Sequence, residues 1–495
     1  MQRVTVFKKC IALLLTAVLL LSLSACASKK VTPKSSTASS SQLTLPFSST
    51  DSIDPYACKS QTNFLLSGLI YESLYKLDKD RQPVGILAES VVTQDTTLTV
   101  TLREAKFSDG NAVTSDDVVH SFSRAKQSER FKYALTCFEN AEKKGAGVVR
   151  FTLSGKNIYA LNLLTFPIVE QKNNYIGSGL YKLSESNGEK FLEYNKYYKQ
   201  AKPKIEKFAL TECRDYTNAV NLFNDGKIDF LFDTLADGNI RSAAINSTKA
   251  KLNNFLFLGL NAKKGMCKNK AFRAALSLAI NQTELCADAL QGFAVPTATP
   301  FDADWSEIGT VVSNSVLSKS NEAGEAFAAA GCAYDKMQVN LMADDEQIVL
   351  TLLVNSANNM KIALANQIKT QLVNFGISVE IKKMPLDEYN IAIENENFDM
   401  YIGEVKIEND FNFDCFFTED GGADFGISAK KLSQSYRLFK SGNATLQDFV
   451  SDFCALNPFI PIGYKCADVC FNASLKVNAD ISENDIYSGI EEWSK

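Results

Sequence analysis

Histidine is nearly absent from this chain, which narrows the chemistry open to the protein. The 495 residues include a single histidine, His120. Hydrolytic triads and histidine-bound metals both need an imidazole at a defined position. His120 lies in a helix that is predicted to begin at Thr114. The apolar face of this helix includes Val118 and Phe122, and His120 is not part of that face. We therefore interpret His120 as a surface residue and expect no metal site.

Several motifs that identify common enzymes are also missing. The sequence after residue 42 contains no G-x-S-x-G, H-E-x-x-H, G-x-x-x-x-G-K-[ST] or G-x-G-x-x-G pattern. Carboxylates are plentiful, so a surface hydrolase that works through a carboxylate pair stays open as an alternative. No pattern favours it, and we predict a protein that is not an enzyme and has no cofactor.

Runs of basic residues are missing as well. The formal net charge is −5, with 52 basic against 57 acidic residues. Nucleic-acid-binding proteins carry a basic patch or stripe that neutralises phosphates. The mild acidity of this chain therefore argues against nucleic acid as a partner.

The N-terminal segment, residues 1–25, is predicted to be a signal peptide. Basic residues precede an apolar run, Ile11 to Leu23, which is shorter than the about 20 residues that span a bilayer. Small residues, Ser24 and Ala25, stand directly before Cys26, as at the cleavage site of bacterial lipoproteins. The motif predicts a lipid on Cys26, which would hold the mature protein at the outer face of the cytoplasmic membrane.

The next segment, residues 26–42, is predicted to be the lipidated cysteine followed by a flexible tether. Between Ser28 and Gln42 no side chain larger than valine could be buried, so the segment cannot offset the entropy of ordering. The folded body begins near Leu43. Its length exceeds what one hydrophobic core usually serves, and we expect two or three lobes.

Twelve cysteines are present, but their arrangement does not indicate a disulfide framework. Cys10 would leave with the signal peptide and Cys26 would carry the lipid. The other ten are scattered, and Cys286 and Cys454 stand among apolar neighbours, as small buried hydrophobes do. A long chain with a full core does not need disulfides, so we predict free thiols and keep disulfides as the alternative.

Hydrophobic periodicity predicts a mixed α/β body. A tight turn at residues 107–110 precedes the Thr114 helix, and Asp117 is its predicted capping partner. After residue 350 the pattern predicts a strand, a helix that ends at Gly376 and a second strand. This order is typical of a βαβ unit with parallel strands. The predicted strands are 98–102, 149–153, 350–354 and 377–381, and further predicted helices are 272–280 and 358–375.

Short motifs occur in a characteristic order along nearly all of the mature chain. They are SGLIYESL at 67–74, LAES at 87–90, LREAKFSDG at 102–110, SDDVV at 115–119, GSGLY at 177–181, LGLN at 258–261 and FRAAL at 272–276. Together they resemble the family-5 extracellular solute-binding proteins, which are the peptide-binding subunits of ABC importers.

The resemblance implies the type II fold of periplasmic binding proteins, with two α/β lobes joined by a hinge. Residues 43–62, 175–255 and 462–495 would form lobe I. Residues 63–174 would form an extra subdomain on it, and residues 256–461 would form lobe II. The implied hinge residues are Leu258, Gly259, Leu260, Asn261, Phe459, Ile460 and Pro461.

The resemblance also implies that the protein binds and delivers a ligand without catalysing a reaction. A monomeric lipoprotein would enclose a peptide, expected to be an oligopeptide in extended form, between its lobes and deliver it to an ABC permease and its ATPase. The same fold could bind an oligosaccharide or a metal chelate, or could sense a peptide signal. These remain alternatives.

Ligand-binding residues are expected in one stretch of lobe II. Better-known members of the family bind the free ammonium of the peptide with an aspartate in a W-x-x-D-Y motif. The corresponding residues 403–414 read GEVKIENDFNFD, without that motif. The candidate ligand-binding residues are the carboxylates Glu404, Asp410 and Asp414 and the aromatic side chains Phe411 and Phe413.

Overall fold

The computed structural model describes residues 42–241, 246–312, 320–337, 339–418, 421–427, 430–477 and 480–494. Gln42–Lys495 form one compact unit. The predicted signal peptide, the lipid site Cys26 and the tether as far as residue 41 lie outside the described residues. None of the helices in the described part combines the length and the apolar character needed to cross a bilayer.

Lobe I is built on a four-stranded sheet with the order β1-β10-β9-β8. β1 and β10 are parallel, and the other pairs are antiparallel. Helix α2 (Gln61–Ile70) begins at Ser60, whose side chain accepts a hydrogen bond from the Asn63 N–H, and it packs into the core of lobe I. The strands are β1 (Leu43–Phe47), β8 (Tyr181–Ser186), β9 (Glu189–Tyr194) and β10 (Lys207–Glu212).

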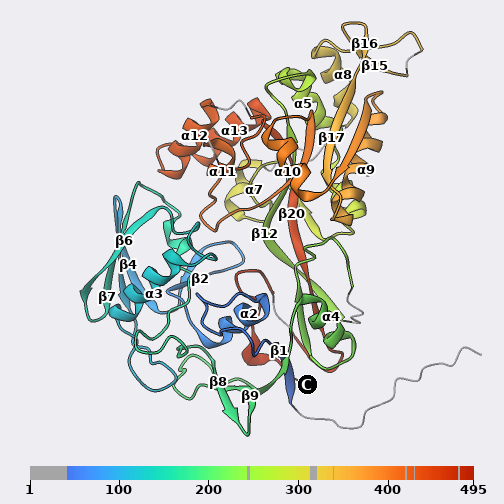
Figure 1. Cartoon of the computed structure of the whole chain (residues 1–495). Helices are drawn as coiled ribbons and strands as arrows, with labels where there is room; N and C mark the ends of the chain where they lie inside the picture. Colours follow the sequence, from blue (N-terminus) through green and yellow to red (C-terminus); the bar gives the residue numbers. More distant parts are fainter. Residues whose placement is uncertain are drawn as a thin grey trace, which may run out of the picture. The chain divides into compact units, whose positions relative to one another are not determined.

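The subdomain is an antiparallel sheet, β4-β5-β7-β6, covered by helix α3 (Ser115–Gln127) (Figure 1). The predicted strands 98–102 and 149–153 and the predicted helix are confirmed, and Asp117 Oδ2 accepts a 2.8 Å hydrogen bond from the Thr114 N–H. The strands are β4 (Ala88–Gln94), β5 (Thr97–Leu102), β6 (Phe138–Gly145) and β7 (Val148–Leu153), with the hairpin β2 (Tyr75–Leu77) and β3 (Pro83–Gly85) beside them.

Lobe II contains most of a seven-stranded sheet with the order β11-β20-β12-β19-β17-β18, in which β13 also pairs with β20. The predicted βαβ unit is confirmed, because β17 and β18 are parallel and α9 connects them. Gly376, with φ +74°, closes the turn after α9. The strands are β11 (Phe230–Asp233), β12 (Asn246–Leu260), β13 (Ala294–Pro296), β17 (Val349–Asn355), β18 (Ser378–Met384), β19 (Met400–Lys406) and β20 (Phe459–Phe471).

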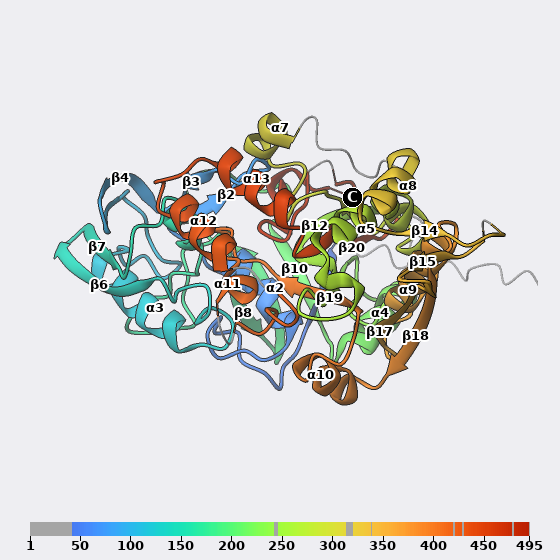
Figure 2. The ribbon, with the colours of Figure 1, turned by 90° about the horizontal axis from the view of Figure 1, so that it is seen from above.

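Helices cover both faces of this sheet. In Figure 2, α12 and α13 lie on one side of β12 and β20, and α9 lies on the other. Alternate side chains of β12 therefore enter different cores: Leu256 and Leu258 pack toward α5 and α9, whereas Phe255 and Phe257 enter an aromatic cluster with α12 and α13. The helices are α4 (Tyr216–Asn224), α5 (Lys270–Ala279), α7 (Ser306–Val312), α8 (Ser320–Ala329), α9 (Asn359–Val373), α10 (Leu386–Glu394), α11 (Asp414–Phe417), α12 (Lys430–Lys440) and α13 (Leu446–Leu456).

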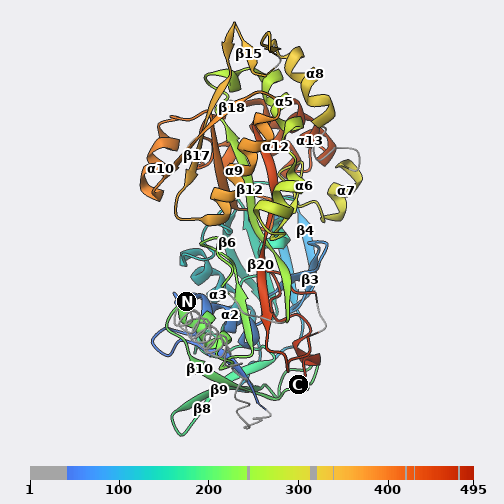
Figure 3. The ribbon, with the colours of Figure 1, turned by 90° about the vertical axis from the view of Figure 1, so that its right-hand side faces the viewer.

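Two long antiparallel strands, β12 and β20, run side by side through the cores of both lobes (Figure 3). Leu252 of β12 packs in the core of lobe I, and Phe255 packs in lobe II. The register with β20 shifts between Lys251 and Phe255, so a bulge interrupts the ladder where the core changes. This segment, residues 251–255, is called the crossover bulge below.

The implied hinge residues lie farther into lobe II than the crossover bulge. Gly259 pairs with Phe459, and Leu258 pairs with Ile460, inside the regular ladder of β12 and β20. The hinge role of residues 258–261 and 459–461 stays a prediction, as do the exact lobe boundaries.

The packing around Gly259 leaves no room for a larger side chain, and a substitution can test this. A Cβ atom at this position would lie 2.0 Å from Cε1 of the buried Tyr401 ring, so Gly259→Ala should lower the free energy of unfolding by about 1–3 kcal/mol. Gly309→Ala in α7 is the control, because among the described residues no atom outside its own helix backbone and chain neighbours lies within 4 Å of the added methyl group. Urea unfolding of both variants measures the difference, and equal stabilities would contradict the packing described here.

Candidate functional site

A cavity of about 440 Å³ lies where lobe I, the subdomain and the end of β19 meet. Helix α2 and the C-terminal segment 483–487 line it from lobe I, and Arg130 and Phe131 line it from the subdomain. Lys406, Glu408 and Asn409 line it from lobe II. Since all three parts contribute, a molecule bound here would contact each of them.

Most charged groups in the cavity neutralise one another. Lys406 forms an ion pair with Glu483, and Lys76 Nζ lies 3.4 Å from Asp485 Oδ2. Glu408 is different, because no hydrogen bond or ion pair joins its carboxylate to another residue of the described part of the chain. Burial raises the pKa of Glu408 to about 7. A positively charged ligand group would supply the partner that this carboxylate lacks.

Arg130 is the complementary group in the subdomain. Its guanidinium lies over the Phe64 ring at 4.1 Å and donates hydrogen bonds to Gln61 Oε1 (3.1 Å) and the Lys59 carbonyl (3.2 Å). Within the described ranges, none of its hydrogen bonds goes to a carboxylate. Arg130 is therefore held in place by neutral groups and remains available to a carboxylate of a ligand.

Glu404, a candidate from the sequence, lies outside the cavity lining. Its carboxylate accepts a 2.8 Å hydrogen bond from Asn254 and forms ion pairs with Lys361 (2.8 Å) and Lys465 (3.3 Å). Burial alone would raise the pKa of Glu404, but the two lysines outweigh it and hold the pKa at about 2. The arrangement ties β19 to α9 and β20.

The other candidates also lie outside the cavity lining. Asp410 Oδ2 is 2.6 Å from Lys440 Nζ and accepts a 2.8 Å hydrogen bond from Asn157. Asp414 is the first residue of α11, and burial raises its pKa. Phe411 and Phe413 are 1% and 0% exposed, inside the aromatic core of lobe II. The ligand-binding roles of all five candidates stay predictions.

The sequence did not predict Glu408 or Arg130, two charged cavity side chains without an ion pair in the described part of the chain. Glu408 stands in the same stretch as Glu404 and Asp410, and only their partners elsewhere in the chain distinguish the three carboxylates. Arg130 follows helix α3 and belongs to no motif. A search for charged residues beside each family motif would have included Glu408, whereas no sequence signal marks Arg130.

Histidine and cysteine take no part in the cavity. His120 is half-buried on α3, and its Nε2 lies 2.9 Å from Asn174 Oδ1. Across the described ranges, no group of three or more histidine, cysteine or acidic side chains is arranged to hold a metal. Within the described part of the chain, the nine cysteines from Cys58 to Cys466 are free thiols.

Sequence comparison identifies related proteins. The family model described as bacterial extracellular solute-binding proteins, family 5 Middle, matches residues 82–418. The oligopeptide-binding protein AppA of Bacillus subtilis is 25% identical over 364 residues, which cover 67% of this chain and 66% of AppA. The glutathione-binding protein GsiB of Escherichia coli is 25% identical over 272 residues, covering 49% of this chain and 52% of GsiB. The matches thus span between half and two thirds of these relatives.

Solved structures share the fold. A nickel ABC transporter protein from Bacillus halodurans superposes with a TM-score of 0.72 at 15% identity, covering 92% of this chain and 99% of that chain. AppA from Bacillus subtilis in complex with a nonapeptide gives a TM-score of 0.57 at 19% identity, covering 91% and 98%. The expected fold class, a two-lobed α/β protein of the type II periplasmic-binding kind, is confirmed.

The buried ion pairs of Glu404 predict a pH-dependent stability. Since its folded pKa of about 2 lies below the ordinary value of 4.5, Glu404 stabilises the fold above about pH 4.5 and loses this contribution as the pH falls toward 2. At pH 7, Glu404→Gln should lower the free energy of unfolding by about 3 kcal/mol, because two lysines lose their counter-charge. The difference from the parent chain should shrink below pH 4.5.

Denaturant unfolding between pH 3 and pH 7 measures this difference. The matched control is Asp452→Asn, which removes an ion pair with Lys431, a side chain that is 72% exposed. It should cost less than about 1 kcal/mol. A Glu404→Gln variant as stable as this control at pH 7 would contradict the role assigned to the buried pairs.

Proposed function

Because this chain belongs to the bacterial extracellular solute-binding proteins of family 5, we propose that it binds a short peptide in the cavity and passes it on unchanged. The observation that carries the proposal is the pair of unsatisfied charges, Glu408 from lobe II and Arg130 from the subdomain. A free peptide carries an ammonium at one end and a carboxylate at the other. Its two ends match these two groups.

The cavity size supports a ligand of a few residues. Pockets of roughly 300–1,000 Å³ hold drug-sized molecules, and this cavity measures about 440 Å³. An extended nonapeptide of the kind bound to AppA would span about 30 Å. We therefore propose shorter peptides for this chain.

The remaining walls suit a peptide of varied sequence. Asn253, Asn409 and Asn484 bring side-chain amides to the cavity, and amides can both donate to and accept from a peptide backbone. Aromatic rings, among them Phe131 and Tyr487, offer apolar surface to side chains. Backbone recognition with loose side-chain contacts is a known route to broad peptide binding.

We also propose the expected cellular setting. A lipid on Cys26 would hold the protein at the outer face of the cytoplasmic membrane, where an ABC permease and its ATPase would receive the ligand from the monomeric binding protein. The sequence before Cys26 and the extracellular character of the family support this proposal. Binding and release need no bond cleavage, so the proposed protein is not an enzyme.

Glu408 should recognise the ammonium of the ligand. Glu408→Gln should weaken the binding of tripeptides with free ends by about 10- to 100-fold, because a charge-assisted hydrogen bond is lost. An ammonium favours the ionised carboxylate, so binding releases the proton that Glu408 holds below its pKa of about 7. Affinity for the parent chain should therefore fall as the pH drops from 8 to 6, and the variant should lack this dependence.

Titration calorimetry at pH 6, 7 and 8 measures both effects. A thermal-shift screen of short peptides, sugars and metal chelates selects the tripeptide to be used. Stabilisation by a sugar or a chelate alone would reject the peptide proposal. A tripeptide bound equally well by Glu408→Gln would reject the role of Glu408.

Arg130 should recognise the carboxylate of the ligand. Arg130→Met keeps the length of the apolar stem and should weaken binding of a tripeptide by about 10- to 100-fold. Amidating the C-terminus of the tripeptide should weaken binding to the parent chain by a similar factor, and the two changes together should cost little more than either alone. Fully additive losses would show that Arg130 acts elsewhere.

A further inference from the structure

Arg81 occupies an unusual position at the tip of the β2–β3 hairpin of the subdomain. Its backbone has φ +59°, in the left-handed region that side-chain-bearing residues rarely adopt. Its side chain is only 7% exposed, although it carries a full charge. A strained backbone and a buried charge both cost free energy, and such sites persist where the surrounding contacts compensate for them.

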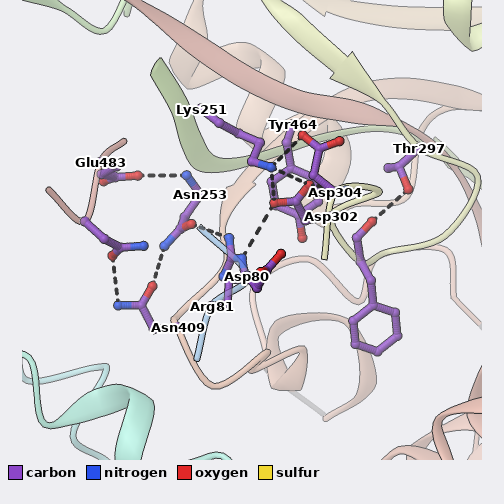
Figure 4. Close-up of polar contacts among 12 residues, drawn as sticks. Asp80, Arg81, Lys251, Asn253, Thr297, Asp302, Asp304, Asn409, Tyr464 and Glu483 are labelled. Atoms are coloured by element: carbon purple, nitrogen blue, oxygen red, sulfur yellow. Dashed lines mark hydrogen bonds and ion pairs between the residues drawn. The ribbon is translucent and has the colours of Figure 1, made fainter. Parts of the chain in front are cut away.

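The guanidinium of Arg81 reaches out of the subdomain to the crossover bulge and lobe II (Figure 4). Nη2 donates a 2.5 Å hydrogen bond to Asn253 Oδ1 of the crossover bulge, and Nε lies 3.6 Å from Asp302 Oδ2 of lobe II. The guanidinium carbon lies 5.4 Å from the centre of the Phe411 ring. One side chain thus joins the subdomain to the crossover bulge and to lobe II.

A second ion pair of Asp302 also joins the crossover bulge to lobe II. Its carboxylate is 2% exposed and lies 2.8 Å from Nζ of Lys251, the residue at which the register of β12 shifts. Arg81 and Lys251 therefore share one buried carboxylate, as Figure 4 shows. The place where the chain passes between the two cores is held by charge as well as by strand pairing.

One partner of Arg81, Asn253, also lines the cavity. Asn253 donates from its backbone N–H to Glu483 Oε2 (2.7 Å) and from its side chain to Asn409 Oδ1 (2.7 Å), and all three residues line the cavity. Asn162 completes the connection, because its amide donates to the carbonyl oxygens of Arg81 (3.1 Å) and Asn409 (3.2 Å). Arg81 itself is not among the lining residues of the cavity.

We propose that Arg81 is a positioning residue that latches the crossover bulge and thereby holds the cavity walls of lobe I and lobe II together. Movement of the lobes about the bulge breaks its bonds to Asn253 and Asp302, so the latch favours the arrangement in which the cavity is assembled. The proposal rests on the proposed function only in treating this cavity as the ligand site. It does not depend on which ligand occupies the site.

Hydrogen exchange on the full chain without any ligand tests the latch. In Arg81→Met, amides of the crossover bulge, of residues 463–467 opposite it and of residues 481–487 should exchange about tenfold faster or more, because local opening no longer breaks the latch. The sheet of the subdomain and helix α9 should keep their protection. Arg150→Met is the matched control, since the one ion pair of this arginine among the described residues is an exposed pair with Glu142 at 3.9 Å.

The pattern of exchange separates a latch from ordinary structural support. Faster exchange restricted to residues 75–85 would overturn the proposal, because Arg81 would then support only its own hairpin. Faster exchange throughout the chain would overturn it as well, since it would report general destabilisation. If Arg81→Met does not fold, Asp302→Asn takes its place, because it weakens the same latch from lobe II and must give the same local pattern.

The outcome is independent of the peptide proposal. A latch revealed by exchange in a chain that binds no peptide would reject the proposed ligand and leave the role of Arg81 standing. Conversely, a tripeptide bound with equal dissociation rates by the parent chain and by Arg81→Lys, which cannot reproduce the forked contact with Asn253 and Asp302, would reject the latch alone.

Discussion

The whole arrangement depends on two strands, β12 and β20, that belong to both lobes. All 13 residues of β20 are buried, and its neighbour β12 contributes side chains to three separate cores. A strand shared in this way cannot shift its register without exposing apolar side chains in both lobes. The lobes are therefore coupled through a ladder that is regular along most of its length, with register shifts at the crossover bulge and between Leu256 and Phe257.

The positions of the charged side chains follow this division into lobes and crossover bulge. Carboxylates inside lobe II, such as Glu404 and Asp410, are matched with lysines that join neighbouring elements. At the crossover bulge, the Asp302 carboxylate forms ion pairs with both Lys251 and Arg81. In the cavity, no ion pair or hydrogen bond joins the Glu408 carboxylate to another described residue, and burial raises its pKa to about 7. Matched charges hold the framework, whereas the proposed ligand site contains a carboxylate without an ion pair within the described ranges.

The local elements were predictable because their signals are local. The capping contact between Thr114 and Asp117 involves residues three positions apart. Gly376 ends the turn after α9 through its own backbone conformation. The alternation of residues 98–102 determines which side chains of one strand face the core. The order of such elements, together with the short motifs, was enough to identify the family and the fold class.

The sequence by itself determined several helices and strands, among them the βαβ unit after residue 350, and the family, since caps, turns and periodicity act between residues close along the chain. Only the tertiary structure decided which charges are satisfied. Glu404 and Glu408 are four positions apart, yet one meets Lys361 and Lys465 and the other faces a cavity. Arg81 likewise reaches Asp302, more than two hundred positions away. Coulomb interactions depend on distance in space, and folding sets that distance independently of separation along the chain.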